Sequence, residues 1–251
     1  MSEGIVRWGD VVNKFELYYK MRIYTYATHE QGLFKELINN EFSTKIRVVG
    51  FGTKWNGFMD KIVGIRDAII SDGVESGEIV IFLDGFDSRI RLDPAEGVRR
   101  YEEMYPNQPV LCSLDTLIPF AFVREKIFRG SLNSGMYMGP AGKVCSMLEA
   151  CMETNATDDQ RAFNLVYRSG SLDMAVDNDQ VIFHNLTYYE RAPKCISDQS
   201  MAVFVSCPGE LSFSRYSRVF TEYVSYIWVE ILLMCVIIFV ICRVMRAALS
   251  K

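Results

Sequence analysis

Short apolar runs alternate with stretches of helical periodicity along most of the chain. Residues 79–83 (IVIFL) are five apolar residues in a row, which is typical of a strand buried on both faces. Residues 59–72 instead space four isoleucines along one side of a helix. This alternation predicts an α/β fold: a mostly parallel, Rossmann-like sheet flanked by helices.

The same pattern gives the expected order of elements. Strands are predicted at 21–28, 45–52, 78–84, 108–114, 134–139 and 179–186, and helices near 30–40, 59–72, 94–106 and 141–154. No internal repeat or linker divides residues 20–200. We therefore expect one large globular domain.

The C-terminal region has a different pattern. Residues 223–242 contain a single charge, Glu230, and as a helix they would span about 30 Å, the thickness of the bilayer hydrocarbon. The expected layout is an N-terminal extension (1–20), the globular domain (21–210), a juxtamembrane segment (211–222), a transmembrane helix (223–242) and a short basic tail (243–251). A buried core helix at 223–242 is the alternative.

The side of the membrane on which the domain lies is less clear from the sequence. Residues 1–20 are too polar for a signal peptide, and a span so near the C-terminus resembles a tail anchor, so we expect the domain to face the cytosol. The basic residues after the span argue for the lumen. Two glycosylation sequons, at Asn155 and Asn185, would matter only there.

Charge and cysteine content argue against a nucleic-acid-binding protein and against a cysteine-based zinc site. The net charge is −4 and no basic run is present, so nucleic acid is not an expected partner. The seven cysteines form no C-x-x-C pair and no zinc spacing. Mostly free thiols are expected, with a disulfide framework as the alternative.

Two acids directly follow the apolar run at 79–83. Asp84 and Asp87 are separated by Gly85 and Phe86, and the glycine allows a tight turn. Open α/β sheets bind their ligands at the carboxyl ends of parallel strands. Carboxylate oxygens without sulfur ligands suit Mn²⁺ or Mg²⁺ better than zinc.

Six segments together carry a resemblance to a known family. In chain order they are TYAT, GFGTKWNGF, FLDGFDS, LNSGMYMG, DDQ and DNDQVIFHNL. This order is similar to the glycosyltransferase domain of procollagen lysyl hydroxylases, over about residues 21 to 210. The resemblance implies a GT-A fold and an enzyme that transfers a sugar from a UDP-sugar to a hydroxyl acceptor on a protein or a glycan. The predicted span at 223–242 would make this enzyme membrane-anchored.

The resemblance assigns a metal and a nucleotide to this chain. Asp84 and Asp87 match the acids that hold Mn²⁺ and UDP, and a divalent ion can neutralise the charge that grows on a leaving diphosphate. Thr25 matches a residue that contacts the nucleotide, and Trp55 matches one that encloses it. Lys61 matches a lysine that reaches the phosphates. A core tryptophan and a solvated lysine are the alternatives for the last two.

Two further motifs are candidates for the sugar and the acceptor. Asn133, Ser134 and Gly135 could bind sugar hydroxyls, or form an ordinary turn. Asp158 and Asp159 are the catalytic candidates, because a carboxylate can orient or deprotonate an acceptor hydroxyl. The alternative for these acids is a helix N-cap.

The chain also departs from the family pattern. Ser206 stands where a late family motif supplies a metal-binding histidine, so water or Ser206 completes the metal shell, or metal binding is weak. Phe120 is the nearest candidate for an aromatic residue over the donor. His184 is expected to be a packed core histidine. A non-catalytic GT-A-like domain that binds a nucleotide sugar or a partner protein at a membrane therefore remains the alternative function.

Overall fold

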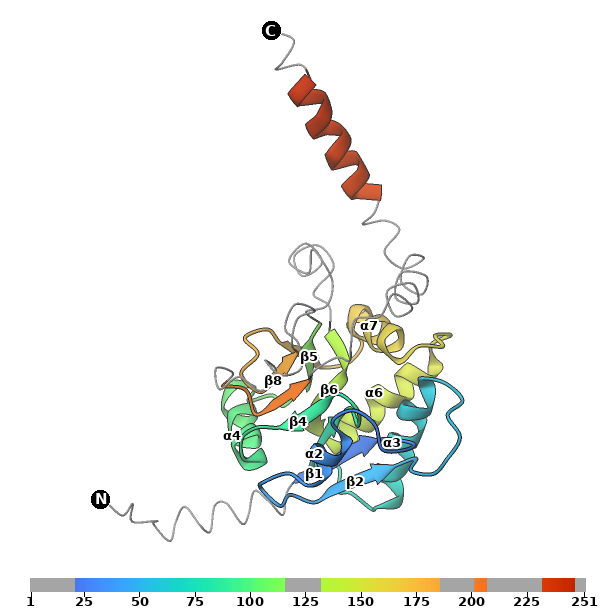
Figure 1. Ribbon diagram of the computed structural model, residues 1–251, viewed down its shortest axis with the longest axis vertical. Coiled ribbons are helices and arrows are strands. Elements are labelled where there is room, and N and C mark those ends of the chain that lie inside the picture. Colours follow the sequence, from blue (N-terminus) through green and yellow to red (C-terminus); the bar gives the residue numbers. More distant parts are fainter. Residues whose placement is uncertain (1–20, 116–131, 186–200, 207–231, 247–251) are drawn as a thin grey trace, which may run out of the picture. The chain divides into compact units, whose positions relative to one another are not determined.

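The computed structural model describes residues 21–115, 132–185, 201–206 and 232–246 (Figure 1). Its centre is a six-stranded sheet in the order β2 (Ile46–Val49), β1 (Met21–Tyr26), β3 (Ile79–Leu83), β6 (Leu132–Pro140), β5 (Val110–Leu114) and β7 (Met174–Asp177). Neighbouring strands are parallel except at β6, which runs antiparallel to both β3 and β5. The predicted mostly parallel sheet is therefore confirmed, and it fits a GT-A-like fold.

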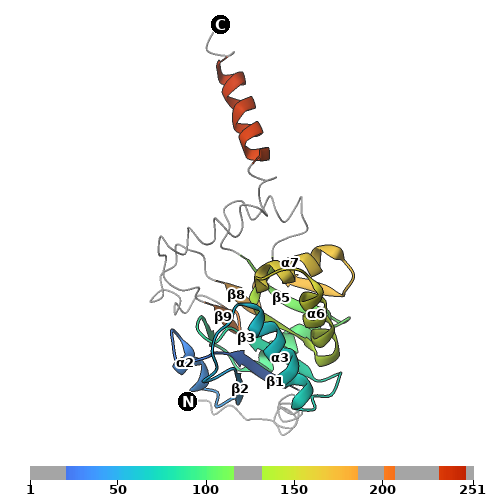
Figure 2. The same cartoon turned by 90° about the vertical axis from the view of Figure 1, so that its right-hand side faces the viewer.

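Helices cover both faces of this sheet (Figures 1 and 2). One face packs against α3 (Met59–Ser71), α6 (Ala141–Glu153) and α7 (Asp159–Ser169). The other face packs against α2 (Phe34–Ile38), α4 (Pro94–Met104) and a small sheet in the order β4 (Ser88–Ile90), β9 (Phe204–Ser206) and β8 (Phe183–Asn185).

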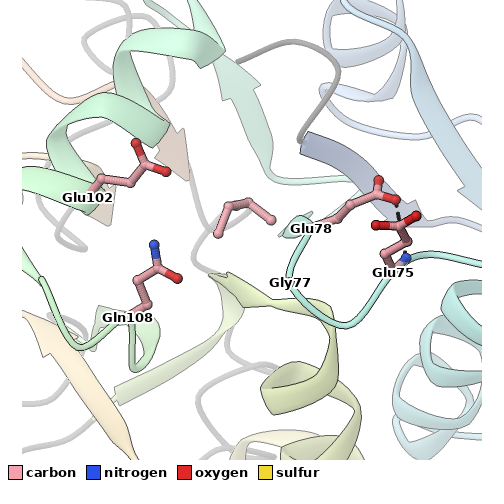
Figure 3. A pocket seen from close by; sticks show the side chains of 6 residues that line it. Glu75, Gly77, Glu78, Glu102 and Gln108 are labelled. Carbon is pink, nitrogen blue, oxygen red and sulfur yellow. Dashed lines mark hydrogen bonds between the residues drawn. The ribbon is translucent and has the colours of Figure 1, made fainter. Parts of the chain in front are cut away.

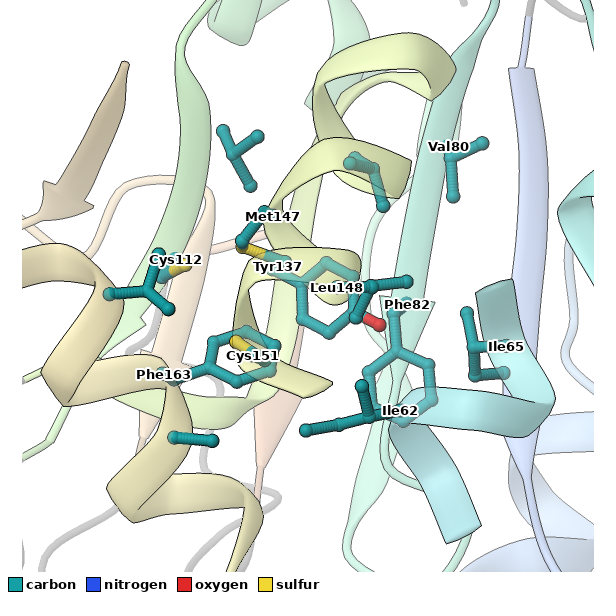
Figure 4. Packing of buried hydrophobic residues seen from close by; sticks show 14 of the residues in the cluster. Ile62, Ile65, Val80, Phe82, Cys112, Tyr137, Met147, Leu148, Cys151 and Phe163 are labelled. Atoms are coloured by element: carbon teal, nitrogen blue, oxygen red, sulfur yellow. The ribbon is translucent and has the colours of Figure 1, made fainter. Parts of the chain in front are cut away.

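Strand β3 contributes to both hydrophobic cores, because successive side chains of a strand point to opposite faces. Val80 and Phe82 belong to the core under α3, α6 and α7, which Figure 4 shows. Ile81 and Leu83 belong to the other core. Phe82 also stacks on Tyr137 of β6, with ring centroids 4.8 Å apart. Each large apolar side chain buried in this way contributes about 1.5–3 kcal/mol, so β3 is a rigid base for the acids that follow it.

Most predicted elements are present, with two changes of extent. The strand expected at 134–139 is longer and begins at Leu132, so LNSG is strand and not an ordinary turn. The strand expected at 179–186 begins only at Phe183 and belongs to the small sheet, and residue 186 lies outside the described residues. The reason is Asp177, whose carboxylate accepts hydrogen bonds from the backbone N–H groups of Ile182 (2.8 Å) and Phe183 (2.7 Å) and holds the preceding residues in a turn.

The C-terminal residues form a separate compact unit, 210–251, which follows unit 1–209 in the chain. Within it, residues 232–246 are helical and expose large apolar side chains such as Ile238 and Phe239. In the part of the chain that the structure describes, no helix has the length and apolar character needed to cross a bilayer. Because the first nine residues of the predicted span 223–242 lie outside that part, the anchor is not supported here and stays a prediction.

The described cysteines are all free thiols: Cys112, Cys145, Cys151, Cys235 and Cys242. This confirms the expectation for these five, whereas Cys195 and Cys207 lie outside the described residues. Asn185, the acceptor residue of the second sequon, is 2% exposed and its amide donates to the Leu114 carbonyl at 2.7 Å, so this side chain is not accessible in the described part of the chain. The sequon at Asn155 is exposed.

Candidate active site

The candidate site lies where β3 ends and β6 begins. Because β6 is antiparallel to β3, its first residues lie beside the last residues of β3. The backbone N–H of Asp84 donates to the carbonyl of Gly135 at 2.8 Å. The motifs FLDGFDS and LNSG therefore meet at the edge of the sheet where α/β proteins bind ligands.

Lys61 joins this edge to the N-terminus of α7. Its ammonium, carried by α3, lies 3.2 Å from Oδ2 of Asp84 and 2.6 Å from Oδ2 of Asp159. The three side chains are 14%, 19% and 7% exposed, respectively. The alternative of a solvated lysine is therefore wrong. Two carboxylates around one ammonium leave the cluster with one net negative charge.

The electrostatic environment keeps Lys61 charged. Burial tends to lower the pKa of this ammonium, but attraction and hydrogen bonding to the carboxylates of Asp159 and Asp84 together outweigh burial. The pKa of Lys61 is therefore raised above its ordinary value. Lys61 is thus a permanent cation at the carboxyl edge.

The two candidate catalytic acids have different surroundings. Asp158 is the N-cap of α7, and its side chain accepts a hydrogen bond from the N–H of Arg161 at 2.8 Å. The alternative role as a helix N-cap is thus confirmed for Asp158. Asp159, the first residue of the helix, instead faces Lys61 from the positive end of the helix dipole. A catalytic role stays a prediction for both.

The segment DDQ also binds LNSG directly. The Ser134 hydroxyl donates to Asp159 Oδ2 at 3.0 Å, and the Ser134 backbone N–H donates to Gln160 Oε1 at 3.0 Å. Gln160 Nε2 donates to the carbonyl of Leu132. Asn133 is partly exposed, and its Oδ1 accepts the N–H of Gly135 at 2.8 Å. The predicted sugar-binding and acidic segments therefore form one hydrogen-bonded unit.

The turn that carries Asp84 and Asp87 packs tightly on the end of β1. Asp84 Oδ1 accepts the N–H of Phe86 at 3.1 Å. A Cβ atom at Gly85 would lie 2.6 Å from the carbonyl oxygen of Tyr26 and 3.0 Å from Oγ1 of Thr25, so only glycine fits. Thr25 is fully buried and its hydroxyl donates to the Leu83 carbonyl at 2.7 Å. Thr25 thus holds the end of β3 in place, and its contact with a nucleotide stays a prediction.

Trp55 lies in the loop between β2 and α3, next to the charged cluster. Its ring is 5.9 Å from that of Tyr26 and 5.5 Å from that of Phe58, both edge-on. The Phe58 ring is in turn 6.0 Å from the Lys61 ammonium. Because Trp55 is 40% exposed, the core alternative is wrong. An exposed aromatic face here is available for stacking on a base.

Asp84 and Asp87 suit a metal ion that would also be bound by the phosphates of a ligand. Within the described ranges, no group of three or more His, Cys, Asp or Glu side chains could hold a metal ion. Mg²⁺ and similar ions, however, commonly bind one or two carboxylates together with substrate phosphates. Asp84 and Asp87, both partly exposed, provide such a pair. Ser206 on β9 pairs with Ser88, the residue after Asp87, so its role as a third ligand stays open.

Two supporting residues were not anticipated from the sequence. Asn164 is buried in α7 and donates to the Gln160 carbonyl at 2.9 Å; its position four residues after Gln160, on the same side of a helix, was an available signal. Asn185 donates to Ser113 Oγ at 3.1 Å and connects β8 to the end of β5; the sequence marked it only as a sequon and as part of DNDQVIFHNL, not for this contact. Phe120, the predicted aromatic residue over the donor, lies outside the described residues.

A pocket of about 270 Å³ lies elsewhere in the fold (Figure 3). It is lined by Glu75, Gly77, Glu78, Ile79, Glu102 and Gln108. Ile79 is the first residue of β3, so the pocket is at the opposite end of this strand from Asp84. Its acids do not belong to the candidate site.

Comparison with known proteins places these features in a family. The family model described as "PLOD GT domain" matches residues 18–204. The chain belongs to this family. It is also similar to the "Multifunctional procollagen lysine hydroxylase and glycosyltransferase" of Caenorhabditis elegans, at 27% identity over 184 residues. That match covers 65% of this chain and 25% of the relative, so the chain corresponds to about a quarter of the relative's length. The candidate residues from Thr25 to Asp159 all lie inside the family match.

Proposed function

We propose that this PLOD GT domain is a glycosyltransferase that transfers a sugar from a UDP-sugar to a hydroxyl acceptor on a protein or a glycan. The observation that carries the proposal is the cluster of Lys61 with Asp84 and Asp159 at the carboxyl edge of the sheet. A cation between two acids at this edge is suited to a ligand that has both phosphates and hydroxyls. Family membership supports the same activity.

The residues divide into a nucleotide side and a sugar side. On the nucleotide side, Asp84 and Asp87 hold a divalent ion, Mn²⁺ or Mg²⁺, whose chemistry is to neutralise charge on the leaving diphosphate. Lys61 donates to the phosphates, a role that suits a compact, flexible cation. Trp55 stacks on the base, and Thr25 keeps the end of β3 next to the nucleotide.

On the sugar side, LNSG and the start of α7 act together. Asn133, Ser134 and Gly135 bind sugar hydroxyls, and the exposed part of Asn133 is available for this contact. Asp159 orients the sugar or accepts the proton of the acceptor hydroxyl. Asp158 supports this role by capping the helix that presents Asp159.

The test is ligand-dependent stability of the full chain in detergent. A ligand at a hundredfold excess over its Kd raises stability by about 2.7 kcal/mol, so UDP with Mn²⁺ should raise the Tm clearly, and much less with chelator. Asp84→Asn and Asp87→Asn should each remove this gain and also reduce sugar transfer or slow UDP-sugar hydrolysis. Asp67→Asn, which changes a carboxylate that is 56% exposed on α3, should keep both.

One observation favours a non-catalytic alternative. Ser206 replaces the expected histidine, and no group of three possible metal ligands is present in the described part of the chain. In this alternative, the domain binds a nucleotide sugar or a partner protein and transfers no sugar. A Tm gain with UDP and Mn²⁺, but no turnover with any donor in a panel of UDP-sugars, would support this alternative. Wild-type protein that ignores UDP at millimolar Mn²⁺ would contradict transfer from a UDP-sugar, and a non-catalytic domain that binds a partner protein would then be the leading function.

We further propose that residues 223–242 anchor the domain to a membrane and that the domain faces the cytosol. The exposed apolar side chains of helix 232–246 support the anchor. The lumen is the alternative location. The exposed sequon at Asn155 distinguishes the two, because an endoglycosidase-sensitive glycan there in cells would place the domain in the lumen.

A further inference from the structure

The Lys61 ammonium already contacts the carboxylate of Asp84 that a metal ion would bind. It is 3.2 Å from Asp84 Oδ2, and the other oxygen of this carboxylate accepts the N–H of Phe86. Both oxygens of Asp84 therefore already have partners in the ligand-free chain. The Asp159 side chain, on the other side of the ammonium, is 7% exposed and also accepts a hydrogen bond from the Ser134 hydroxyl.

We propose that Lys61 is a resident counter-cation of Asp84, so that this chain binds a divalent ion strongly only together with the diphosphate of a nucleotide. This inference rests on the proposed function, because it assumes that Asp84 is a metal ligand. Two strand-end acids can already share an ion with substrate phosphates; what Lys61 adds is a penalty for binding of the ion alone. The ion and the nucleotide bind as a coupled pair, and Lys61 is the positioning residue that couples them.

Like-charge repulsion gives the physical reason. A divalent ion at Asp84 would lie close to the Lys61 ammonium, and two cations sharing one carboxylate repel each other strongly in a partly buried site. Nor can the ammonium simply leave, since that would abandon the buried carboxylate of Asp159.

A diphosphate removes this conflict. It brings negative charge for both cations, and the four-carbon stem of lysine lets the ammonium reach a phosphate while it keeps Asp159 as a partner and α3 stays in place. The ion can then take Asp84 without being repelled. The ammonium therefore weakens binding of the ion alone and strengthens binding of the ion with the nucleotide.

Thermodynamic linkage predicts a reciprocal effect of UDP and Mn²⁺ on each other's affinity. UDP must strengthen Mn²⁺ binding by the same factor by which Mn²⁺ strengthens UDP binding. We expect about tenfold or more in the wild type, within the roughly 5–150-fold usual for coupled sites. The full chain in detergent is titrated with Mn²⁺ alone, with UDP alone, and with each in the presence of the other, by calorimetry and by the spin-resonance signal of free Mn²⁺.

The variants separate the lysine from its neighbours. Lys61→Met combined with Asp159→Asn removes both charges of the buried pair and keeps the net charge. Asp84 then loses its counter-cation, and no unpaired carboxylate is left at position 159. The double variant should bind Mn²⁺ alone about tenfold more tightly than the wild type, and its coupling to UDP should shrink correspondingly. The matched control, Asp159→Asn alone, keeps Lys61 on Asp84 and should not gain affinity for Mn²⁺ alone.

Two outcomes would overturn the inference while leaving the proposed function intact. In the first, the wild type binds Mn²⁺ alone as tightly as it binds Mn²⁺ in the presence of UDP. In the second, the wild type shows coupled binding, but the double variant does not bind Mn²⁺ alone more tightly than the wild type. The first of these outcomes overturns the inference even if the double variant does not fold. A wild type that binds neither UDP nor Mn²⁺ would instead refute the proposed function, and the inference with it.

Discussion

The side-chain oxygen of Gln160 accepts the backbone N–H of Ser134 at 3.0 Å, and this bond fixes the start of β6 to the first turn of α7. Both residues are buried, at 8% and 6% exposure. The segments LNSG and DDQ are therefore held together by a polar contact that water does not reach.

Gln160→Ala should destabilise the fold. Without the side chain, the Ser134 N–H is buried with no acceptor, and an unsatisfied buried group costs about 1–3 kcal/mol. We expect the free energy of unfolding in urea to fall by this amount. Gln31→Ala, at an exposed position, should change it by less than about 0.5 kcal/mol. Equal effects of the two substitutions would show that the Ser134 contact contributes little.

Gly85→Ala should disrupt the turn that carries the two acids. The added methyl group would lie 2.6 Å from the Tyr26 carbonyl oxygen and 2.9 Å from the Ala27 side chain, and such overpacking costs about 1–3 kcal/mol. Both the ligand-free Tm and the UDP-dependent gain in Tm should fall. Gly77→Ala has open space around the new methyl group and should leave both unchanged. A Gly85→Ala protein with normal Tm and normal UDP response would mean that the turn is not tight.

Trp55→Ala should weaken nucleotide binding more than it affects folding. Stacking of a base on an aromatic ring is worth about 1–3 kcal/mol, and loss of this contact would raise the Kd for UDP in a calorimetric titration. The control is Phe51→Ala, which removes another exposed ring, 55% exposed and stacked on Phe34. If both variants bind UDP like the wild type, Trp55 does not enclose the nucleotide.

Glu96 should give a pH-dependent contribution to stability. Hydrogen bonds from Arg99, aided by Arg100 and opposed by burial, lower the pKa of Glu96 from 4.5 to about 2. A lowered pKa means that this stability is complete above about pH 4.5 and is lost as the pH falls toward 2.

Glu96→Gln should therefore cost about 1 kcal/mol at pH 7, and less at pH 3, by urea unfolding. The exposed control Glu41→Gln should show no such difference. A cost that does not change between pH 7 and pH 3 would contradict the role of the Arg pairing.

A chain ending at residue 222 should be soluble without detergent and bind UDP normally. Every candidate site residue precedes residue 223, and the compact unit 1–209 contains them. Size-exclusion chromatography and UDP titration test this expectation. Aggregation or unfolding of the shortened chain would mean that residues 223–242 belong to the core.

The sequence predicted the central sheet better than the details around it. β3 was predictable because its apolar run is unbroken, whereas β4 and β9 are only three residues long and leave no readable period. Helix α7 was not predicted as an element, because its inward face includes the buried polar side chains of Gln160 and Asn164, which interrupt the apolar pattern.

The candidate site was predicted residue by residue, but its contacts were not. Family resemblance supplied Lys61, Asp84 and Asp159 as separate residues with separate tasks. Their ion pairing depends on how α3, β3 and α7 pack together, and periodicity within one element carries no information about that. The same applies to Asp177, whose bonds to the following turn shortened the predicted strand at 179–186.

The Lys61 cluster also bears on the order of events in folding. Its three members come from α3, the end of β3 and the start of α7, and Asp159 reaches its place only when β6 and α7 have joined the sheet. Contacts between residues so distant in the chain form slowly, because loop closure must precede them. We therefore expect the charges to remain hydrated until late in folding, and their pairing to affect the rate at which the native state unfolds more than the rate at which it forms.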